Sequence, residues 1–162
     1  SKKAIDILHR HGIVTETSFI LGFPDETEAS VRCTLDLAKW YNPDFAHFLA
    51  ITPWPYADLY KDVKDYIAVT DYSKYNLIDP IIQPKNMTLK DIDRAMVDCY
   101  REFYVGKMQE VLTMTDTFKK SYLLTSMKLI MHSSFIVKKM GNLKDIPHHI
   151  HGAMKQIVGG AL

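Results

Sequence analysis

The pattern of apolar and polar positions in the first part of the chain predicts alternating helices and strands. Residues 13–21 alternate at first and then become almost wholly apolar, which is typical of a strand covered on both faces. Residues 45–51 form a second short apolar run between turn residues and predict another strand. Helical periodicity marks residues 2–11 and 27–41. Because helix and strand alternate at this spacing, we expect an α/β fold in which the two strands are parallel and the crossover is right-handed.

The turn after the first predicted strand has the features of a strand-to-helix connection. Gly22 lets the backbone turn or approach a ligand closely, and Pro24 fixes φ where no ladder donor is needed. The oxygen-bearing residues from Asp25 to Glu28 suit a helix start, because free N–H groups and the helix dipole both favour acceptors there. Ligands of such folds usually bind at the carboxyl ends of the strands. The residues leave two interpretations equally open, a ligand site and a plain connection.

The second predicted strand runs into residues 52–56, whose two prolines exclude regular structure. Since parallel strands end on one edge of a sheet, this segment should lie beside Gly22. Trp54 and Tyr56 would then wall a cleft for a flat organic ligand, or they would simply cover the end of the sheet. His47 alternates with apolar positions of its strand, which is more typical of a hydrogen-bond donor in a core or cleft than of a metal ligand.

The rest of the chain is predicted to be an irregular segment followed by helices. A short helix is expected within residues 57–66, and residues 67–86 lack a clear period. Thr88 and Asp91 have the spacing of a capping box, although the acid is Asp rather than the favoured Glu or Gln. The helices that follow are predicted over residues 88–108, 116–140 and 147–158. The expected domains are a barrel part, a connecting segment and a helical extension: residues 1–56, 57–87 and 88–162.

Apolar positions in these predicted helices follow helical spacing. In the helix of residues 27–41 they include Leu37 and Trp40 and fit this spacing better than alternation. In the helix that begins near residue 116 the apolar stripe is expected to face inward and includes Phe118 and Tyr122.

Composition and charge exclude several classes of protein. With 162 residues, 47% of them apolar, the chain is long enough for one globular domain with a sizeable core. Its 20 basic and 19 acidic residues give no electrostatic reason to expect nucleic acid as a partner. The longest apolar run, residues 122–137, is interrupted by Lys128 and His132, so no transmembrane segment is expected. A signal peptide is absent, which predicts a cytoplasmic location, and the start within a helical pattern predicts a piece of a longer protein.

The cysteines and histidines do not predict a metal site. Cys33 and Cys99 have no C-x-x-C partner and are expected to be reduced, buried thiols. His148, His149 and His151 could bind zinc weakly, but no acidic or cysteine partner stands nearby. No metal ligand is therefore predicted.

Two motifs at the predicted strand ends carry a family resemblance. FILGFPDET at residues 19–27, followed by TPWP at residues 52–55, resembles the second half of a radical S-adenosylmethionine barrel of the cobalamin-binding subgroup. The turn motif alone is shared by many radical enzymes, including methyltransferases of this subgroup. The resemblance extends over nearly the whole chain and is similar to the anaerobic oxidative cyclases of magnesium-protoporphyrin monomethyl ester, through ITPWPYADLY, DYSKYNLIDPI, MTLKDIDRAMVDCYREFY and SMKLIMHSSF.

The resemblance implies a fold and a cofactor site. The fold is the C-terminal portion of a partial TIM barrel, formed by two parallel βα units and followed by a mainly helical extension. Glu26 and Thr27 would fix the first turn and the helix after it. The residues implied to bind S-adenosylmethionine, directly or through the turn, are Ile20, Leu21, Gly22, Glu26, Thr52 and Pro53.

The resemblance also implies a substrate site. Its implied residues are Trp54, Tyr56 and His47. Tyr56 stands where the common TPxPGT pattern of the family has glycine. This departure implies a substrate-specific wall, on which the aromatic face of a porphyrin can stack.

The cluster-binding C-x-x-x-C-x-x-C motif of the family does not occur in this sequence. The resemblance places it in an N-terminal half outside the chain, with the cobalamin-binding domain, so the [4Fe-4S] cluster and cobalamin would bind there and the chain alone would be inactive. The whole enzyme would use a deoxyadenosyl radical to close the fifth ring, with water as the oxygen source. The expected partners are the tetrapyrrole substrate and the missing half, and exposed strand edges predict self-association.

An interpretation from another class also stays open. In it the chain is a helical binding module without catalytic activity. Residues 88–162 would dock a partner or a membrane, and residues 1–56 would be a structural remnant.

Overall fold

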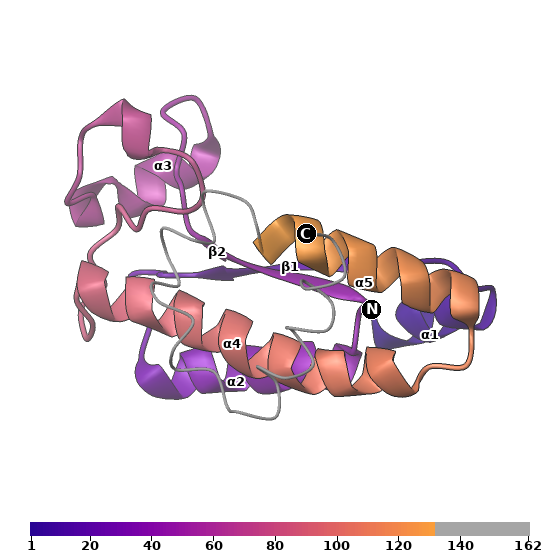
Figure 1. The fold of residues 1–162 in the computed structure, drawn as a ribbon. Helices are drawn as coiled ribbons and strands as arrows, with labels where there is room; N and C mark the ends of the chain where they lie inside the picture. Colours follow the sequence, from indigo (N-terminus) through magenta and orange to yellow (C-terminus); the bar gives the residue numbers. More distant parts are fainter. Residues whose placement is uncertain (132–162) are drawn as a thin grey trace. The chain divides into compact units, whose positions relative to one another are not determined.

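The computed structural model describes residues 1–131 (Figure 1), which contain five α-helices and a two-stranded sheet. The predicted helix at residues 147–158, the end of the helix predicted to reach residue 140, and the histidines at positions 148–151 lie outside the described residues. The chain divides into two compact units, residues 1–103 and 104–162, and each is described by itself. The elements in chain order are α1 (Lys2–Arg10), β1 (Glu16–Leu21), α2 (Glu28–Tyr41), β2 (Phe45–Ala50), α3 (Asp58–Val63), the 3-10 helices η1 (Lys64–Tyr66) and η2 (Tyr72–Lys74), α4 (Leu89–Thr113) and α5 (Thr117–Met131).

The two strands pair in parallel, as the alternation of helix and strand predicts. The register runs from Glu16 opposite Phe45 to Leu21 opposite Ala50, and α2 forms the connection. The first strand begins at Glu16, later than the apolar pattern suggests. The predicted pair of parallel βα units is therefore confirmed, whereas two strands are too few to test the predicted barrel.

A buried network of hydrogen bonds around the Asp44 carboxylate, here called the Asp44 network, joins the amino ends of the strands. Asp44 accepts hydrogen bonds through Oδ2 from the Thr15 backbone N–H (2.8 Å) and from the Thr15 hydroxyl (3.1 Å). The Asp44 N–H is 3.0 Å from Thr15 Oγ1, and the Phe45 N–H donates to the Thr15 carbonyl at 3.0 Å. His9 of α1 reaches the same group, with Nε2 at 3.1 Å from Asp44 Oδ2. Residues of α1 and of both strand starts are thus tied to one buried carboxylate.

Helix α2 is capped at both ends and buries one narrow stripe. Thr27 and Ser30 form a reciprocal capping box at its start, and Asn42 ends it in the left-handed conformation with φ 51°. The buried side chains follow helical spacing at Val31, Leu35 and Ala38. The helix predicted over residues 27–41 is confirmed, but its apolar residues Leu37 and Trp40 lie off the buried stripe, and Trp40 is 60% exposed.

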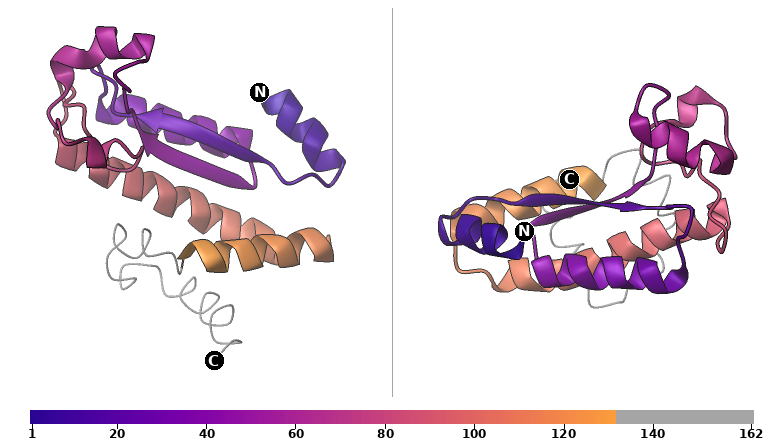
Figure 2. Two further views of the ribbon diagram at one scale, coloured as in Figure 1. Left: turned by 90° about the horizontal axis from the view of Figure 1, so that it is seen from above. Right: turned by 180° about the vertical axis from the view of Figure 1, so that it is seen from behind.

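One face of the sheet is packed against helices. Phe19 and Phe48 stack with their ring centroids 5.5 Å apart. Tyr100 and Phe103 from α4 form T-shaped contacts with Phe48, with centroid distances of 5.4 and 6.2 Å. Figure 1 and the right-hand view of Figure 2 place α2 and the first part of α4 on the same side of the strands. Aromatic packing thus fills the space between this side of the sheet and the helices.

The other face of β1 is open in the part of the chain that the structure describes. Glu16, Ser18 and Ile20 are exposed and alternate with the buried Phe19 and Leu21. The apolar run predicts cover on both faces, so this expectation is not met by the described residues.

Helix α4 begins with the capping box that the sequence predicts. The Thr88 N–H donates to Asp91 Oδ2 at 2.9 Å, and the Asp91 N–H donates to Thr88 Oγ1 at 3.2 Å. Aspartate thus reaches back as the usual Glu or Gln would. This part of α4 buries Ile92, Met96 and Cys99, which follow helical spacing.

The second unit is described from residue 104 to residue 131 and is helical. Its core contains Met108 and Val111 from α4, and Leu123 and Met127 from α5. The prediction for Phe118 and Tyr122 is wrong, since Phe118 is 80% exposed and Tyr122 is exposed as well. The buried stripe of α5 instead runs through residues 119, 123 and 127, where Lys119 takes the place of an apolar side chain. No helix among the described residues is both long enough and apolar enough to span a membrane.

The connecting segment is irregular, as predicted, but it has a core of its own. Val63, Ile81 and Ile82 pack on Ile51 and are buried. A single antiparallel bridge joins Ile67 and Ile82. Backbone bonds from Ala68 to the Ile81 carbonyl (2.9 Å) and from Gln83 to the Tyr66 carbonyl (2.8 Å) complete it. The left-hand view of Figure 2 shows this segment gathered at one end of the strands.

Candidate functional site

The carboxyl ends of the two strands meet at one edge, as the sequence predicts. The Ile51 N–H donates to the Leu21 carbonyl at 2.8 Å, which extends the ladder one step past β2. Residues 52–56 therefore start directly beside the turn at Gly22. The connecting segment is attached to both ends, through bonds from Ala50 N–H to the Leu77 carbonyl (2.8 Å) and from Lys85 N–H to the Pro24 carbonyl (2.9 Å). This edge is the candidate functional site.

The GFPDE turn is held together by its own glutamate. Gly22 has φ +92°, a conformation that other residues rarely adopt, and its N–H donates to Glu26 Oε2 at 2.9 Å. The second oxygen of Glu26 accepts a hydrogen bond from the Ser30 hydroxyl. Because Glu26 is buried and both oxygens are engaged, its carboxylate positions the turn and does not face a ligand.

The residues implied to bind the cofactor divide into an exposed and a buried set. Ile20 is 38% exposed on the open face of β1. Thr52 is half-buried, and its hydroxyl donates to the Ala50 carbonyl at 3.1 Å. The other residues of this set are buried, namely Leu21, Gly22, Glu26 and Pro53. Only Ile20 and Thr52 of this set thus present side-chain surface at the edge.

The two aromatic residues of the implied substrate site differ in exposure. Tyr56 is 86% exposed in a turn closed by the bond from Ala57 N–H to the Trp54 carbonyl at 2.9 Å. Trp54 is half-buried and its ring lies near Tyr75, with a centroid distance of 6.4 Å. The Tyr75 ring in turn contacts the Tyr72 ring, with a centroid distance of 5.0 Å. Sequence reasoning missed Tyr75 as a neighbour of Trp54, and Tyr72 as a neighbour of Tyr75, because only the folding of the connecting segment brings these rings together.

His47 faces the open side of the sheet with a partner that the sequence analysis missed. Its Nε2 lies 2.8 Å from Glu16 Oε1. His47 stands opposite Ser18 in the register, so Glu16 is the neighbour two positions earlier on the same face. The parallel register, once known, is the signal that could have found this pair.

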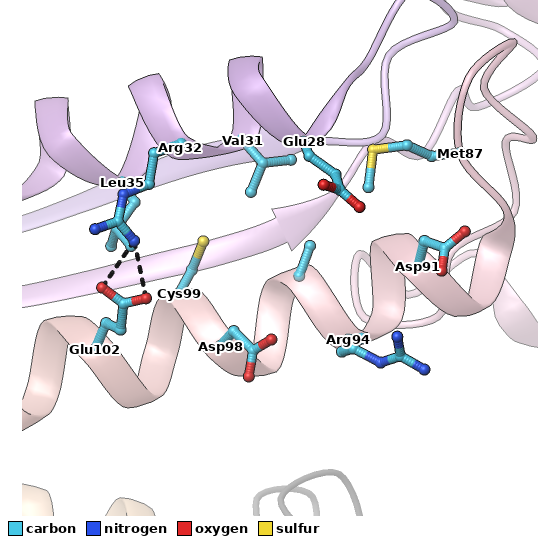
Figure 3. A pocket seen from close by; sticks show the side chains of 11 residues that line it. Glu28, Val31, Arg32, Leu35, Met87, Asp91, Arg94, Asp98, Cys99 and Glu102 are labelled. Atoms are coloured by element: carbon cyan, nitrogen blue, oxygen red, sulfur yellow. Dashed lines mark hydrogen bonds and ion pairs between the residues drawn. The ribbon is translucent and has the colours of Figure 1, made fainter.

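A separate pocket lies between α2 and α4 (Figure 3), with a volume of about 200 Å³. At its rim Arg32 Nη1 lies 3.0 Å and Lys39 Nζ 2.9 Å from the Glu102 carboxylate. The Lys39 hydrogen bond is the main reason that the pKa of Glu102 is lowered. The charges of this rim are therefore partly neutralised by one another, and the pocket is on the helix side of the sheet. Among residues 1–131 no group of three or more His, Cys, Asp or Glu side chains is placed to hold a metal ion.

The two cysteines differ in exposure. Cys33 is exposed, so the prediction that it is buried is wrong, whereas Cys99 is buried as expected. Burial, and then the Glu102 charge, raise the pKa of the Cys99 thiol to about 12. Since the folded pKa lies above that of a free thiol, Cys99 favours the folded state at neutral pH, and this contribution is lost as the pH rises towards 12.

We expect N-ethylmaleimide to modify Cys33 and to spare Cys99 in the folded chain at about pH 8, because the thiolate is the reactive form. Peptide mass spectrometry after a short exposure measures both sites. The chain unfolded in urea is the control and should react at both. Equal modification of the two thiols in the folded chain would contradict the burial of Cys99.

Comparison with known proteins gives relatives for most of the chain, although no family model matches it. The chain is 35% identical to an anaerobic magnesium-protoporphyrin IX monomethyl ester cyclase of Rubrivivax gelatinosus, over 83% of this chain and 24% of that protein. A cyclase of the same name from Cereibacter sphaeroides is 35% identical over 81% of this chain and 22% of its own length. Methyltransferases match as well, such as the bacteriochlorophyllide d C-12(1)-methyltransferase of Chlorobaculum tepidum, which is 29% identical over 61% of this chain and 22% of its own length. The chain thus spans about a quarter of the length of these relatives.

Proposed function

The chain belongs to the family of the anaerobic magnesium-protoporphyrin IX monomethyl ester cyclases, and from this premise we propose that it is the C-terminal part of a cobalamin-dependent radical S-adenosylmethionine enzyme. The proposed reaction is the oxidative closure of the fifth ring of a magnesium tetrapyrrole, with water as the oxygen source. The similarity to the two cyclases, which extends over most of the chain, is the observation that carries this proposal.

The residues at the carboxyl ends of the strands fit an adenosine-containing ligand. Ile20 offers an exposed apolar side chain near the end of β1, and Thr52 offers a half-buried hydroxyl after the end of β2. The Glu26 carboxylate fixes the turn at Gly22 and so sets the position of this edge. S-adenosylmethionine, when bound there, would supply the carbon radical that removes hydrogen from the substrate. The role of this chain is to bind and orient S-adenosylmethionine and the substrate.

The residues of this chain do not fit an iron–sulfur cluster. Such clusters are held by several thiolates, and the sequence has two cysteines. Cys33 is exposed and Cys99 is buried with a high pKa, which disfavours the thiolate. We propose that the cluster and cobalamin are bound by other parts of the enzyme and that this chain alone is inactive.

The open face of β1 also fits a role within a larger enzyme. Glu16, Ser18 and Ile20 are exposed there, although a parallel sheet normally has both faces covered. We propose that the rest of the enzyme covers this face and that the isolated chain self-associates through it. A single monomeric species in sedimentation velocity at high concentration would contradict the self-association.

Product analysis tests the proposed reaction. The whole enzyme that contains this chain is incubated without oxygen with S-adenosylmethionine, a reductant and magnesium-protoporphyrin IX monomethyl ester. We expect a product with the closed fifth ring in mass spectrometry, and we expect Ile20→Glu to lower its rate by about tenfold or more, because a charge would face the cofactor. Ile13→Glu is the matched control, since Ile13 is exposed before β1 and away from the carboxyl edge.

A second function is favoured by the methyltransferases among the relatives. In that case the same assay would give a product that has gained a methyl group and no fifth ring. The binding-module interpretation predicts neither product, and it predicts capture of a partner that is indifferent to Trp54→Ala. A closed-ring product in the wild-type enzyme would exclude both alternatives.

A further inference from the structure

We infer that the connecting segment provides the surface on which a flat aromatic macrocycle stacks, and that Tyr72 is the exposed ring of this surface. We call Trp54, Tyr72 and Tyr75 the aromatic cluster. The inference deepens the proposed function and rests on it, because the tetrapyrrole is the flat ligand that the function supplies.

Tyr72 and Tyr75 belong to the connecting segment, which is fixed at the ligand-binding end of the sheet, and Trp54 lies in the residues that follow β2 at the same end. Backbone bonds tie Leu77 to the end of β2 and Lys85 to the turn after β1, at 2.8 and 2.9 Å. In parallel α/β folds this end of the strands is where ligands bind. The segment that carries Tyr72 is therefore anchored at both strand ends.

Tyr75 lies next to both other rings of the cluster. Trp54 and Tyr75 are half-buried, whereas Tyr72 is exposed. Tyr75 packs on the core of Ile51, Val63, Ile81 and Ile82 and donates a hydrogen bond to the Val69 carbonyl at 3.4 Å. Trp54 lies near it at 6.4 Å, and Tyr72 at 5.0 Å on a tilted plane. Burial raises the pKa of the Tyr75 phenol, as expected for the ring that packs against the core of the segment.

Tyr72 is the ring with free surface. It is 65% exposed, although it already contacts another ring. A tyrosine needed only to fill this small core would be expected to bury most of its area, since that burial is the main gain of placing an aromatic ring there. The exposed side of Tyr72 can instead stack on a ligand while Tyr75 supports it from behind.

The backbone around the cluster is held in an unusual conformation. Leu77 has φ +66°, which is rare for a residue with a branched side chain. The Asn76 side-chain oxygen accepts from the N–H groups of Ile78 and Asp79, each at 2.9 Å, and so fixes the turn. Strained residues that are held by several bonds cluster at ligand sites. The strain at Leu77 is thus a second observation that points to this segment.

Binding of magnesium-protoporphyrin IX monomethyl ester by the full chain tests the inference. The change in porphyrin absorption is followed during titration, so that the signal does not depend on the tryptophans. We expect saturable binding in the wild type, about tenfold weaker binding in Tyr72→Ala, and nearly unchanged binding in Tyr72→Phe, which keeps the ring. Far-UV circular dichroism confirms that each variant is folded.

Tyr122→Ala is the matched control, because Tyr122 is an exposed tyrosine of α5, outside the connecting segment and the implied substrate site. Its affinity should remain within about twofold of the wild type. Equal affinities of Tyr72→Ala and Tyr122→Ala, or no saturable binding by the chain, would overturn the inference. Either result leaves the proposed reaction standing, because product analysis of the whole enzyme tests it independently.

Discussion

Replacement of Asp44 by alanine is expected to lower the free energy of unfolding of the first unit by about 3 kcal/mol. The Asp44 carboxylate accepts hydrogen bonds from the backbone N–H and the hydroxyl of Thr15, and it lies 3.1 Å from His9 Nε2. Asp44 and Thr15 are buried, so water cannot easily replace the lost acceptor. The variant would loosen both strand starts and their tie to α1.

Urea unfolding followed by tryptophan fluorescence measures this change, because Trp40 and Trp54 both lie in the first unit. Asp6→Ala is the matched control, since Asp6 forms only an exposed pair with Lys2 on α1, and its effect should be below about 0.5 kcal/mol. Asp44→Asn keeps one side-chain oxygen and should fall between the two. An Asp44→Ala variant as stable as Asp6→Ala would show that the Asp44 network contributes little to the free energy of unfolding.

Replacement of Gly22 by alanine is expected to cost about 2 kcal/mol of stability. Gly22 has φ +92°, where an L-residue is strained, and it is buried between the sheet and α4. An added Cβ would stand in ordinary van der Waals contact with Ile92 Cγ2 (3.4 Å) and Ile51 Cγ2 (3.5 Å), so the expected cost lies in the backbone conformation. The change would disturb the turn that Glu26 holds.

Gly12→Ala is the matched control. Gly12 also has a positive φ, but its value of +69° lies closer to the left-handed region that L-residues can adopt, and no atom lies within 4 Å of its added Cβ. The Gly12→Ala variant should therefore lose only about 1 kcal/mol. The same urea unfolding experiment compares the two variants, and a Gly22→Ala variant at least as stable as Gly12→Ala would refute the larger backbone strain at Gly22.

The local pattern of the sequence was sufficient to predict the strands, their parallel pairing and the caps. Thr88 and Asp91 are an example, because both partners of the capping box are three residues apart and need no distant contact. The directions of Trp40 and Phe118 could not be predicted in this way. An apolar side chain at roughly helical spacing fits more than one stripe, and the neighbouring elements decide which stripe is buried.

The candidate site was predictable only as far as it is built from strand ends. The rule that parallel strands end on one edge predicts that residues 52–56 lie beside the turn at Gly22, and the bond from the Ile51 N–H to the Leu21 carbonyl agrees with it. The roles of Ile20 and Thr52 come from the family resemblance alone. The pair of Glu16 and His47 depends on the register, which the sequence does not state. Tyr72 and Tyr75 lie in a segment without a period, so only its tertiary packing reveals that Tyr75 lies next to both Trp54 and Tyr72.

The way in which the connecting segment is attached has a consequence for the evolution of specificity. Its two bonds to the strand ends, at Leu77 and Lys85, join backbone to backbone. Such bonds constrain the path of the chain but not the identity of most side chains along it. Residues that face a ligand from this segment can therefore be exchanged while the segment keeps its place. Enzymes with one scaffold and different substrates can arise by substitutions confined to such a segment.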